Sequence, residues 1–348
     1  MSELPYFEAL LNPEAYPHKP QRVELVQTQM SFVFLTGDYV YKVKKPVNLG
    51  YLDYTTLEKR RFFCHQELEL NRRLCPDVYL AVVPITMSLR GASEPKPRAK
   101  RRGRSNLLCI EGEGRAIEYA VKMKQLPQER MMDVLLPSGE VTKEMVARVA
   151  KRLVDFHQKA QTNQRIAAFG KLDVIRQNTD ENFAQTEKYI GISIAPAEYS
   201  RIESYTNDFM QSNTSLFDKR VRESKARDCH GDLHAAHICF TDDICIYDCI
   251  EFNDRFRYCD VASEIAFLAM DLDRYQRADL SQYLVNTYVA LSHDEELLKL
   301  LNFYKCYRAY VRGKVESFKL DDQYIAEEEK AKVLAVAQSY FQLAESYI

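Results

Sequence analysis

One short stretch of the chain gathers most of the side chains that could do polar chemistry. Residues 229–237 read Cys-His-Gly-Asp-Leu-His-Ala-Ala-His, a strand-turn-strand pattern follows over 238–247, and the carboxylates of Asp248 and Glu251 come directly after it. Phosphoryl transfer requires three such groups: an acid on a glycine-containing turn, a nitrogen or oxygen ligand five residues later, and a second acid that a strand pair returns to the same place. The pattern predicts that Asp232 orients an acceptor hydroxyl and takes its proton, while the other groups hold Mg²⁺.

The N-terminal part of the chain predicts a small antiparallel sheet with one helix, able to position a nucleotide. Strand-like residues run from 23 to 43 and are broken by a turn at 36–38. From Thr55 or Thr56, either of which can cap a helix, apolar residues recur at helical spacing up to Cys75. Further strands are expected at 78–85, 107–110 and 118–123.

The C-terminal part predicts a helical lobe that begins near residue 128. The expected fold is α+β and bilobal: a small lobe over 1–128 with a basic hairpin loop near 91–105, and a large lobe over 129–348. The large lobe would contain the catalytic loop, 229–237, and a metal-binding segment, 246–254. We interpret the basic loop as solvated and assign it no function. Helices are expected at 143–160, 175–190, 194–213, 261–273, 277–291, 294–318 and 323–346.

The composition of the chain bears on its binding partners and on its cellular compartment. Lys plus Arg number 48 and Asp plus Glu number 50, so no net field would attract nucleic acid or an anionic membrane. We expect a cytoplasmic protein, because Glu3 stands where a signal peptide would be basic and no apolar run approaches the ~18 residues that span a bilayer. The nine cysteines are scattered without a C-x-x-C pair, which indicates neither a disulfide framework nor a zinc ribbon.

The order of these motifs resembles the aminoglycoside phosphotransferase and choline kinase family, which has a protein-kinase-like fold. The family's HGD-L-x-x-x-N, hairpin and ID-F-G or ID-F-E pattern corresponds here to HGDLHAAH, ICFTDDICIYDC and IEFND. More narrowly, VFLTGDYVYKVKKPV, ELNRRLCPDVYL and VKMKQLPQERM are similar to the kinase-like half of bacterial bifunctional aminoglycoside phosphotransferase and ATP-binding proteins. No P-loop pattern occurs in the chain, so we expect the kinase-like module alone and leave a separate P-loop partner open.

The resemblance assigns roles around the catalytic loop. It makes Asp232 the catalytic acid, places His237 at the usual Asn metal-ligand position and Glu251 at the usual Asp position, and keeps Asp248 as a reserve ligand. Glu in place of Asp preserves a hard oxygen ligand for Mg²⁺. His in place of Asn suits Mn²⁺ or a softer metal better, or else His237 only hydrogen-bonds Asp232 or a phosphate. The resemblance also implies that Asp260 braces the catalytic loop.

In the small lobe the resemblance implies the nucleotide contacts. Lys42 resembles the third-strand lysine that contacts the α- and β-phosphates, and Glu67 its ion-pair partner, with Glu69 as the competing choice. No glycine-rich loop precedes Lys42, so the Ser31 hydroxyl and nearby N–H groups would contact phosphate. The hinge at Met123 to Leu126, with Met123 and Gln125, would pair with adenine. A solvated edge of Lys42, Lys44 and Lys45 is the alternative.

The resulting prediction is an ATP-dependent small-molecule kinase that phosphorylates a hydroxyl of a small polar metabolite. One alternative is a catalytically inactive nucleotide-binding module, and transfer of AMP is another. A third is a zinc enzyme built on His230, His234 and His237, although Gly231 disfavours the helix that would align them. We interpret His230 as a structural residue that hydrogen-bonds backbone. Arg308 and Arg312, one helical turn apart, could grip an anionic substrate or form a solvated face.

Overall fold

The computed structural model describes residues 8–88, 107–322 and 325–348. The chain divides into two compact units. The small unit comprises Met1–Gln128 together with Cys245–Asn253, and the large unit comprises Glu129–Ile244 and Asp254–Ile348. The segment Cys245–Asn253, which we call the returning segment, therefore packs with the small unit although its neighbours along the chain belong to the large one.

An antiparallel sheet with the strand order β1-β2-β3-β6-β4-β5 is the frame of the small unit. Because side chains alternate between the faces of a strand, β3 directs Tyr41 and Val43 to one face and Lys42 and Lys44 to the other. Tyr41 and Val43 are fully buried in a hydrophobic core, which fixes the face that the lysines must take. The strands are β1 (Glu24–Gln27), β2 (Ser31–Leu35), β3 (Tyr39–Lys44), β4 (Tyr79–Ser88), β5 (Leu107–Ile110) and β6 (Ala116–Lys124).

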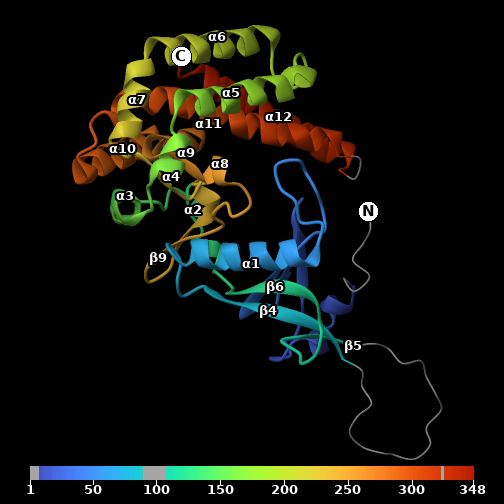
Figure 1. Cartoon of the computed structure of the whole chain (residues 1–348). Coiled ribbons are helices and arrows are strands. Elements are labelled where there is room, and N and C mark those ends of the chain that lie inside the picture. The colour runs from blue at the N-terminus through green and yellow to red at the C-terminus, as the bar shows by residue number, and fades with distance from the viewer. Residues whose placement is uncertain (1–7, 89–106, 323–324) are drawn as a thin grey trace, which may run out of the picture. The chain divides into compact units, whose positions relative to one another are not determined.

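Helix α1 (Leu57–Asn71) packs against β4 and β6 (Figure 1). Its N-terminus is capped by Thr56, whose side chain accepts a hydrogen bond from the backbone N–H of Lys59 at 3.2 Å. A buried ion pair between Arg60 and Glu118 of β6, at 2.8 Å, fastens the first turn to the sheet. The helix is thereby oriented so that Glu67 meets the lysines of β3.

The large unit is mainly helical, and its centre is α9 (Val261–Arg274). Every residue of α9 from Val261 to Leu272 is buried, as expected for a helix covered on all sides by α10, α11 and the loops before it. Figure 1 shows α5, α11 and α12 lying side by side in this unit. The other helices are α2 (Met132–Leu135), α3 (Lys143–Lys159), α4 (Gln164–Ala168), α5 (Leu172–Thr186), α6 (Pro196–Ser212), α7 (Thr214–Arg222), α8 (Asp254–Arg257), α10 (Ala278–Ser292), α11 (Leu297–Phe318) and α12 (Glu327–Glu345).

Short strands hold the catalytic loop against α9. Strand β7 (Ala226–Asp228) ends directly before the loop, and it pairs antiparallel with β10 (Tyr258–Asp260), which ends directly before α9. The pairing therefore brings the start of the loop beside the first turn of α9. Strands β8 (Ile238–Phe240) and β9 (Ile244–Ile246) follow the loop and lead into the returning segment.

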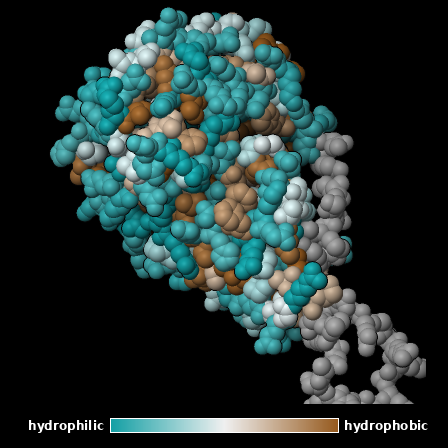
Figure 2. All heavy atoms as spheres, in the orientation of Figure 1, coloured by the Kyte–Doolittle hydropathy of each residue, from teal (hydrophilic) through white to brown (hydrophobic). Residues whose placement is uncertain are grey.

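The mixed helix and sheet architecture that the sequence predicts is confirmed. The predicted basic loop at 91–105 lies outside the described residues. Among the helices that the structure describes, none combines the length and apolar character needed to cross a membrane. On the face drawn in Figure 2, hydrophilic residues predominate and hydrophobic ones form small separate groups.

Candidate active site

The catalytic loop is held by a buried carboxylate of α9. Glu264 Oε1 accepts hydrogen bonds from the backbone N–H groups of His230 and Gly231, each at 2.7 Å, and Glu264 Oε2 lies 2.7 Å from His157 Nε2. Burial alone would raise the pKa of Glu264, but the hydrogen bond from His157 and the charges and donors around it lower the pKa to about 2. Glu264 is therefore ionised and holds the loop backbone in place. His157 is a core residue, as predicted.

Asp260 does not brace the loop, and that expectation is wrong. Among the described residues, its carboxylate pairs with Arg220 through two hydrogen bonds of 2.8 and 2.6 Å and caps α9 by accepting from Ala262 N at 2.8 Å. The reason is its place at the end of β10, where the chain turns into the helix and leaves an N-terminal N–H to be satisfied. Glu264, one turn further along α9, is the residue that reaches the loop.

Asp232 is the part of the loop that faces outward. Its side chain is 32% exposed, and its carboxylate lies 3.5 Å from His234 Nε2 and 3.7 Å from His237 Nδ1. Burial would raise the pKa of Asp232, but His234, His237 and Arg312 together hold it well below its ordinary value. The backbone N–H of Asp232 donates to His230 Nδ1 at 3.3 Å, which confirms the structural role predicted for His230. Asp232 is therefore ionised at neutral pH.

His237 also contacts the backbone of Asp232, which lies five positions before it in the sequence. Its Nδ1 lies 2.9 Å from the carbonyl oxygen of Asp232. A carbonyl oxygen can only accept, so in the hydrogen-bonded form of the neutral ring Nδ1 carries the proton and Nε2 carries the lone pair. His237 thus contacts the loop backbone through its Nδ1.

The three-histidine zinc site considered from the sequence does not form. The catalytic loop is not helical before position 235, because Gly231 has a φ of 88° that no α-helix contains. The rings of His230 and His237 are 6.0 Å apart, and His230 Nδ1 already accepts the Asp232 N–H. Only His234 and His237 lie close together, with ring centroids 3.9 Å apart.

Arg308 and Arg312 of α11 do not act as a pair. Arg308 is 6% exposed, and it donates to the carbonyl oxygen of Gly231 at 3.1 Å and to the Ser263 hydroxyl at 3.1 Å, so it supports the catalytic loop. Within the described parts of the chain, the one carboxylate within 4 Å of the Arg312 guanidinium is that of Glu316, at 3.9 Å. The positive charge of Arg312 therefore acts on Asp232, whereas Arg308 holds the backbone of the catalytic loop.

In the small unit, Lys42 lies between two carboxylates. Its Nζ is 2.9 Å from Glu67 Oε1 and 2.6 Å from Asp248 Oδ1. Burial alone would lower the pKa of Lys42, but Asp248 and Glu67 outweigh it and raise the pKa well above its ordinary value. The expected ion pair with Glu67 is present, and the competing choice, Glu69, is exposed on the opposite side of α1. Lys42, Glu67 and Asp248 thus form one group, in which the Glu67 carboxylate is buried and the Asp248 carboxylate is partly exposed.

Lys44 is a site residue that the sequence analysis missed. Its ammonium group is 1% exposed and pairs with Glu67 Oε2 at 2.7 Å and with the Glu251 carboxylate. The Tyr54 hydroxyl donates to the same Glu251 oxygen at 2.5 Å. The alternative of a solvated lysine edge is therefore wrong for Lys44. The two-residue spacing from Lys42, which places both on one face of β3, was the available signal.

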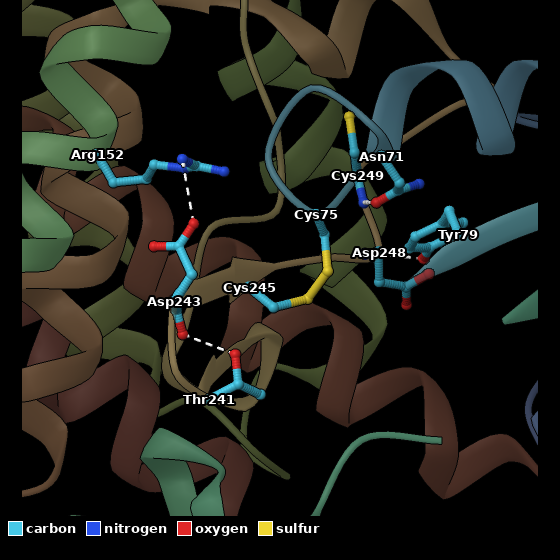
Figure 3. Close-up of a disulfide and its surroundings, with 9 residues drawn as sticks. All are labelled: Asn71, Cys75, Tyr79, Arg152, Thr241, Asp243, Cys245, Asp248 and Cys249. Atoms are coloured by element: carbon cyan, nitrogen blue, oxygen red, sulfur yellow. Dashed lines mark hydrogen bonds and ion pairs between the residues drawn. A yellow bond between two sulfur atoms is a disulfide. The ribbon is translucent and has the colours of Figure 1, made fainter. Parts of the chain in front are cut away.

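The returning segment is fixed to the small unit by several contacts close to Asp248. Figure 3 shows the backbone N–H of Cys249 donating to Asn71 Oδ1, at 2.8 Å, and the backbone N–H of Asp248 reaching the Tyr79 hydroxyl, at 3.3 Å. A disulfide between Cys75 and Cys245 anchors the start of the segment (Figure 3).

The disulfide corrects the sequence analysis, which found no disulfide framework among the cysteines. Cys75 and Cys245 are 170 residues apart, and their Cα atoms lie 4.7 Å apart, within the range that a disulfide requires. The pairing was not visible in the sequence because it depends on the return of β9 to the loop between α1 and β4. Spacing along the chain carries no information about such a pair.

Of the two carboxylates on the returning segment, Asp248 fits a metal ion better than Glu251. The Asp248 side chain is 39% exposed, whereas that of Glu251 is 6% exposed and already bonded to Lys44 and Tyr54. Asp248 also has a φ of 63°, in the left-handed region, and such backbone strain concentrates at functional sites. An accessible carboxylate oxygen is the donor that Mg²⁺ and Mn²⁺ prefer.

The turn before β2 offers less to a phosphate than expected. Ser31 is 2% exposed, so its hydroxyl does not face solvent. The side-chain oxygen of Thr28 accepts from the backbone N–H groups of Met30 and Ser31, at 3.3 and 3.0 Å. The donors that would face a phosphate are thus turned inward to Thr28.

The predicted hinge lies at the end of β6. Met123 is 7% exposed, and Gln125 is tied to the turn after β2: its N–H donates to Asp38 O at 3.0 Å and its Oε1 accepts from Gly37 N at 3.1 Å. Gln125 is therefore a brace. The N–H of Leu126 has no hydrogen-bond partner among the residues that the structure describes, so it is the hinge donor that a base could use.

Comparison by sequence finds relatives without an assigned activity. The chain is 30% identical over 295 residues to uncharacterized proteins of Mycobacterium tuberculosis (Rv2004c) and Mycobacterium bovis (Mb2027c). The match covers 84% of this chain and 54% of each relative, so the chain spans about half the length of the curated relatives it matches. No family model matches the chain.

Comparison by structure identifies the fold. The chain is similar to an amicoumacin kinase in complex with AMP-PNP, Ca²⁺ and Ami, with a TM-score of 0.56 and 12% identity over 98% of this chain and 94% of that one. It is also similar to a choline/ethanolamine kinase family protein from Mesorhizobium loti, with a TM-score of 0.50 and 11% identity over 98% of this chain and 99% of that one. The chain therefore has the protein-kinase-like fold of the aminoglycoside phosphotransferases and choline kinases, as its motifs predict.

Proposed function

We propose that the chain is an ATP-dependent phosphotransferase that moves the γ-phosphoryl group to a hydroxyl of a small polar molecule. The observation that carries the proposal is the contact of Lys42 with both Glu67 and Asp248, on a fold whose similar solved structures include a kinase with bound AMP-PNP and Ca²⁺. A lysine held by a helix carboxylate beside a metal-binding aspartate is the arrangement that kinases use to bind and orient phosphates.

In this proposal the small unit binds the nucleotide. Lys42 contacts the α- and β-phosphates, and Glu67 holds its side chain extended through the 2.9 Å ion pair. The Leu126 N–H pairs with adenine, and Met123 and Gln125 support the hinge. The buried Ser31 contributes through the shape of its turn rather than through its hydroxyl.

Asp248 is the proposed principal metal ligand, with His237 as a second. Glu251 supports Asp248 indirectly, because Lys44, which pairs with Glu251, and Lys42, which pairs with Asp248, both pair with Glu67. A bound Mg²⁺ or Mn²⁺ would offset the charge that spreads over the phosphoryl oxygens. Glu251 gives up two strong contacts if it binds metal itself, because Lys44 and Tyr54 both bind its carboxylate. We therefore rank Asp248 above Glu251.

Asp232 orients the acceptor hydroxyl. Its low pKa means that it is ionised but only weakly basic, so it accepts the hydroxyl proton late, once the bond to phosphorus is forming. A loose transition state tolerates such a weak base, because positioning contributes more than deprotonation. The charge of Arg312 contributes to the low pKa of Asp232, and in this proposal Arg312 would face the acceptor or the transferred group.

Three variants test the proposal. Asp232→Asn should keep the affinity for AMP-PNP with Mn²⁺ but lower phosphotransfer to an acceptor, found by screening sugars, amino sugars and amino alcohols, by at least ~10²-fold. Asp248→Asn should lose the metal-dependent part of nucleotide binding, and Glu67→Gln should weaken binding. Glu69→Gln, an exposed change on the same helix, is the matched control and should behave as wild type.

An inactive nucleotide-binding module is the second candidate, favoured by His237 at the usual asparagine position and by the closed turn around Thr28. It predicts that AMP-PNP raises the melting temperature while no acceptor in the panel is phosphorylated. Absence of any nucleotide affinity would exclude both candidates.

A further inference from the structure

Among the described residues of the large unit, two groups of metal-ligating side chains come together. His157, Cys229 and Glu264 form one, but all three are buried, and the Glu264 carboxylate is engaged with the loop backbone and with His157. Asp232, His234 and His237 form the other, with one donor atom from each lying within 4.8 Å of the other two. Only the second group is open to solvent, with side chains that are 32, 10 and 13% exposed.

The distances between these donor atoms suit a shared transition-metal ion better than they suit direct hydrogen bonds between the side chains. Zn²⁺ binds histidine nitrogen and carboxylate oxygen at about 2.0–2.2 Å, so neighbouring donors of a tetrahedral site are about 3.3–3.6 Å apart. Asp232 Oδ2 lies 3.5 Å from His234 Nε2 and 3.7 Å from His237 Nδ1. Both separations are too long for good hydrogen bonds. The first already falls within the range for a shared metal ion, and the second exceeds that range only slightly.

The chemistry of the donors selects the kind of cation. Imidazole nitrogen suits Zn²⁺, Co²⁺ and Ni²⁺, whereas Mg²⁺ prefers oxygen and retains its water. Binding through His237 Nδ1 would exchange its hydrogen bond with Asp232 O for a metal bond and move the ring proton to Nε2. That exchange gives up one hydrogen bond, which is small beside the affinity of such sites.

We propose that Asp232, His234 and His237 form a binding site for one transition-metal dication of the Zn²⁺ type, with the remaining coordination position open to water. The site shares only His237 with the Asp248 site proposed above, and it differs from that site in its ligands Asp232 and His234 and in its metal preference. Occupancy engages the Asp232 carboxylate, so the cation should inhibit phosphotransfer. This inhibition rests on the proposed function, whereas metal binding does not.

The test uses Co²⁺ as the probe on metal-free full-length protein, without nucleotide. We expect one Co²⁺ per chain, with the visible absorption of a four- or five-coordinate centre, displaced by Zn²⁺ but not by millimolar Mg²⁺. His234→Gln and His237→Asn should each weaken Co²⁺ binding by more than the ~10–100-fold that loss of an outer-shell partner costs. His65→Gln, an exposed histidine on α1, is the control and should change nothing.

Two results would overturn the proposed metal site: absence of stoichiometric Co²⁺ binding, or wild-type Co²⁺ affinity in both folded histidine variants. A loss in His65→Gln equal to that in His237→Asn overturns it as well. If Co²⁺ binds as expected but no acceptor is ever phosphorylated, the metal site stands and the proposed function fails. If the chain is an active kinase that does not bind Co²⁺, the reverse holds, and Zn²⁺ should leave turnover unchanged.

Discussion

Lys42 and Lys44 lie on one face of β3 and share Glu67, yet replacing Lys44 by methionine should mainly reduce stability, whereas replacing Lys42 should mainly weaken nucleotide binding. Lys44 is 1% exposed and neutralises Glu67 and Glu251, which are themselves 0% and 6% exposed. Removing one partner of a buried ion pair leaves a charge without compensation and costs about 3–5 kcal/mol. Lys44→Met should therefore lower the free energy of unfolding by about 3–5 kcal/mol.

Lys42→Met should cost much less in stability. Its side chain is 17% exposed, its partner Asp248 is 39% exposed, and Glu67 retains its ion pair with Lys44. Water can take over the solvation of Asp248, so the cost should be about 1 kcal/mol, close to that of a surface pair. The same variant should weaken AMP-PNP binding by at least ~10-fold, because Lys42 is the proposed phosphate ligand.

Urea unfolding of the nucleotide-free variants, followed by circular dichroism, measures both costs on one scale. The double variant Lys44→Met with Glu251→Met, which removes both charges of the buried pair, should recover most of the lost stability. The same cost for both single variants, or a larger cost for Lys42→Met, would refute the assignment of Lys44 to structure and Lys42 to nucleotide. So would a double variant less stable than Lys44→Met alone.

Three further predictions concern other parts of the molecule. Glu264→Gln should lower the free energy of unfolding by about 3 kcal/mol at pH 7, because the pKa of Glu264 is about 2 in the folded state against an ordinary 4.5, and this difference stabilises the fold above pH 4.5. In urea unfolding at pH 3, about half of this stabilisation should be lost, because the carboxylate of the unfolded chain is then protonated. Reduction of the Cys75–Cys245 disulfide, or Cys75→Ser, should lower the free energy of unfolding by about 2–5 kcal/mol, seen as a lower melting temperature with reductant. His237→Asn should raise Mg²⁺-supported turnover by about 10-fold relative to Mn²⁺-supported turnover, since an amide oxygen suits Mg²⁺ better; an unchanged ratio would place His237 away from that metal.

Patterns within single elements predicted much of the fold. Strand-like residues on both sides of the turn at 36–38 marked β2 and β3, and the threonine cap with its helical spacing marked α1, whose observed start at Leu57 follows Thr56. The helices at 143–160 and 261–273 were predicted within one residue of their observed ends. Such signals depend on neighbours along the chain, which a sequence displays directly.

Contacts between distant segments escaped prediction. The burial of Lys44 depends on Glu251, 207 residues away, and the disulfide joins residues separated by 170. Asp260 was misassigned because its ion pair with Arg220, 40 residues away along the chain, could not be seen in the sequence. For Lys44, Cys75 and Asp260 the residue type was informative, whereas the partner was set by the tertiary fold.

A crystal structure with AMP-PNP and Mn²⁺ is the sharpest test of the proposed nucleotide site, because the anomalous signal of manganese locates the metal independently of the protein density. We expect Mn²⁺ on the Asp248 carboxylate, the phosphates on Lys42, and the γ-phosphate beside Asp232. Manganese held by Glu251 without Asp248, or a triphosphate that touches neither Lys42 nor Asp232, would contradict it.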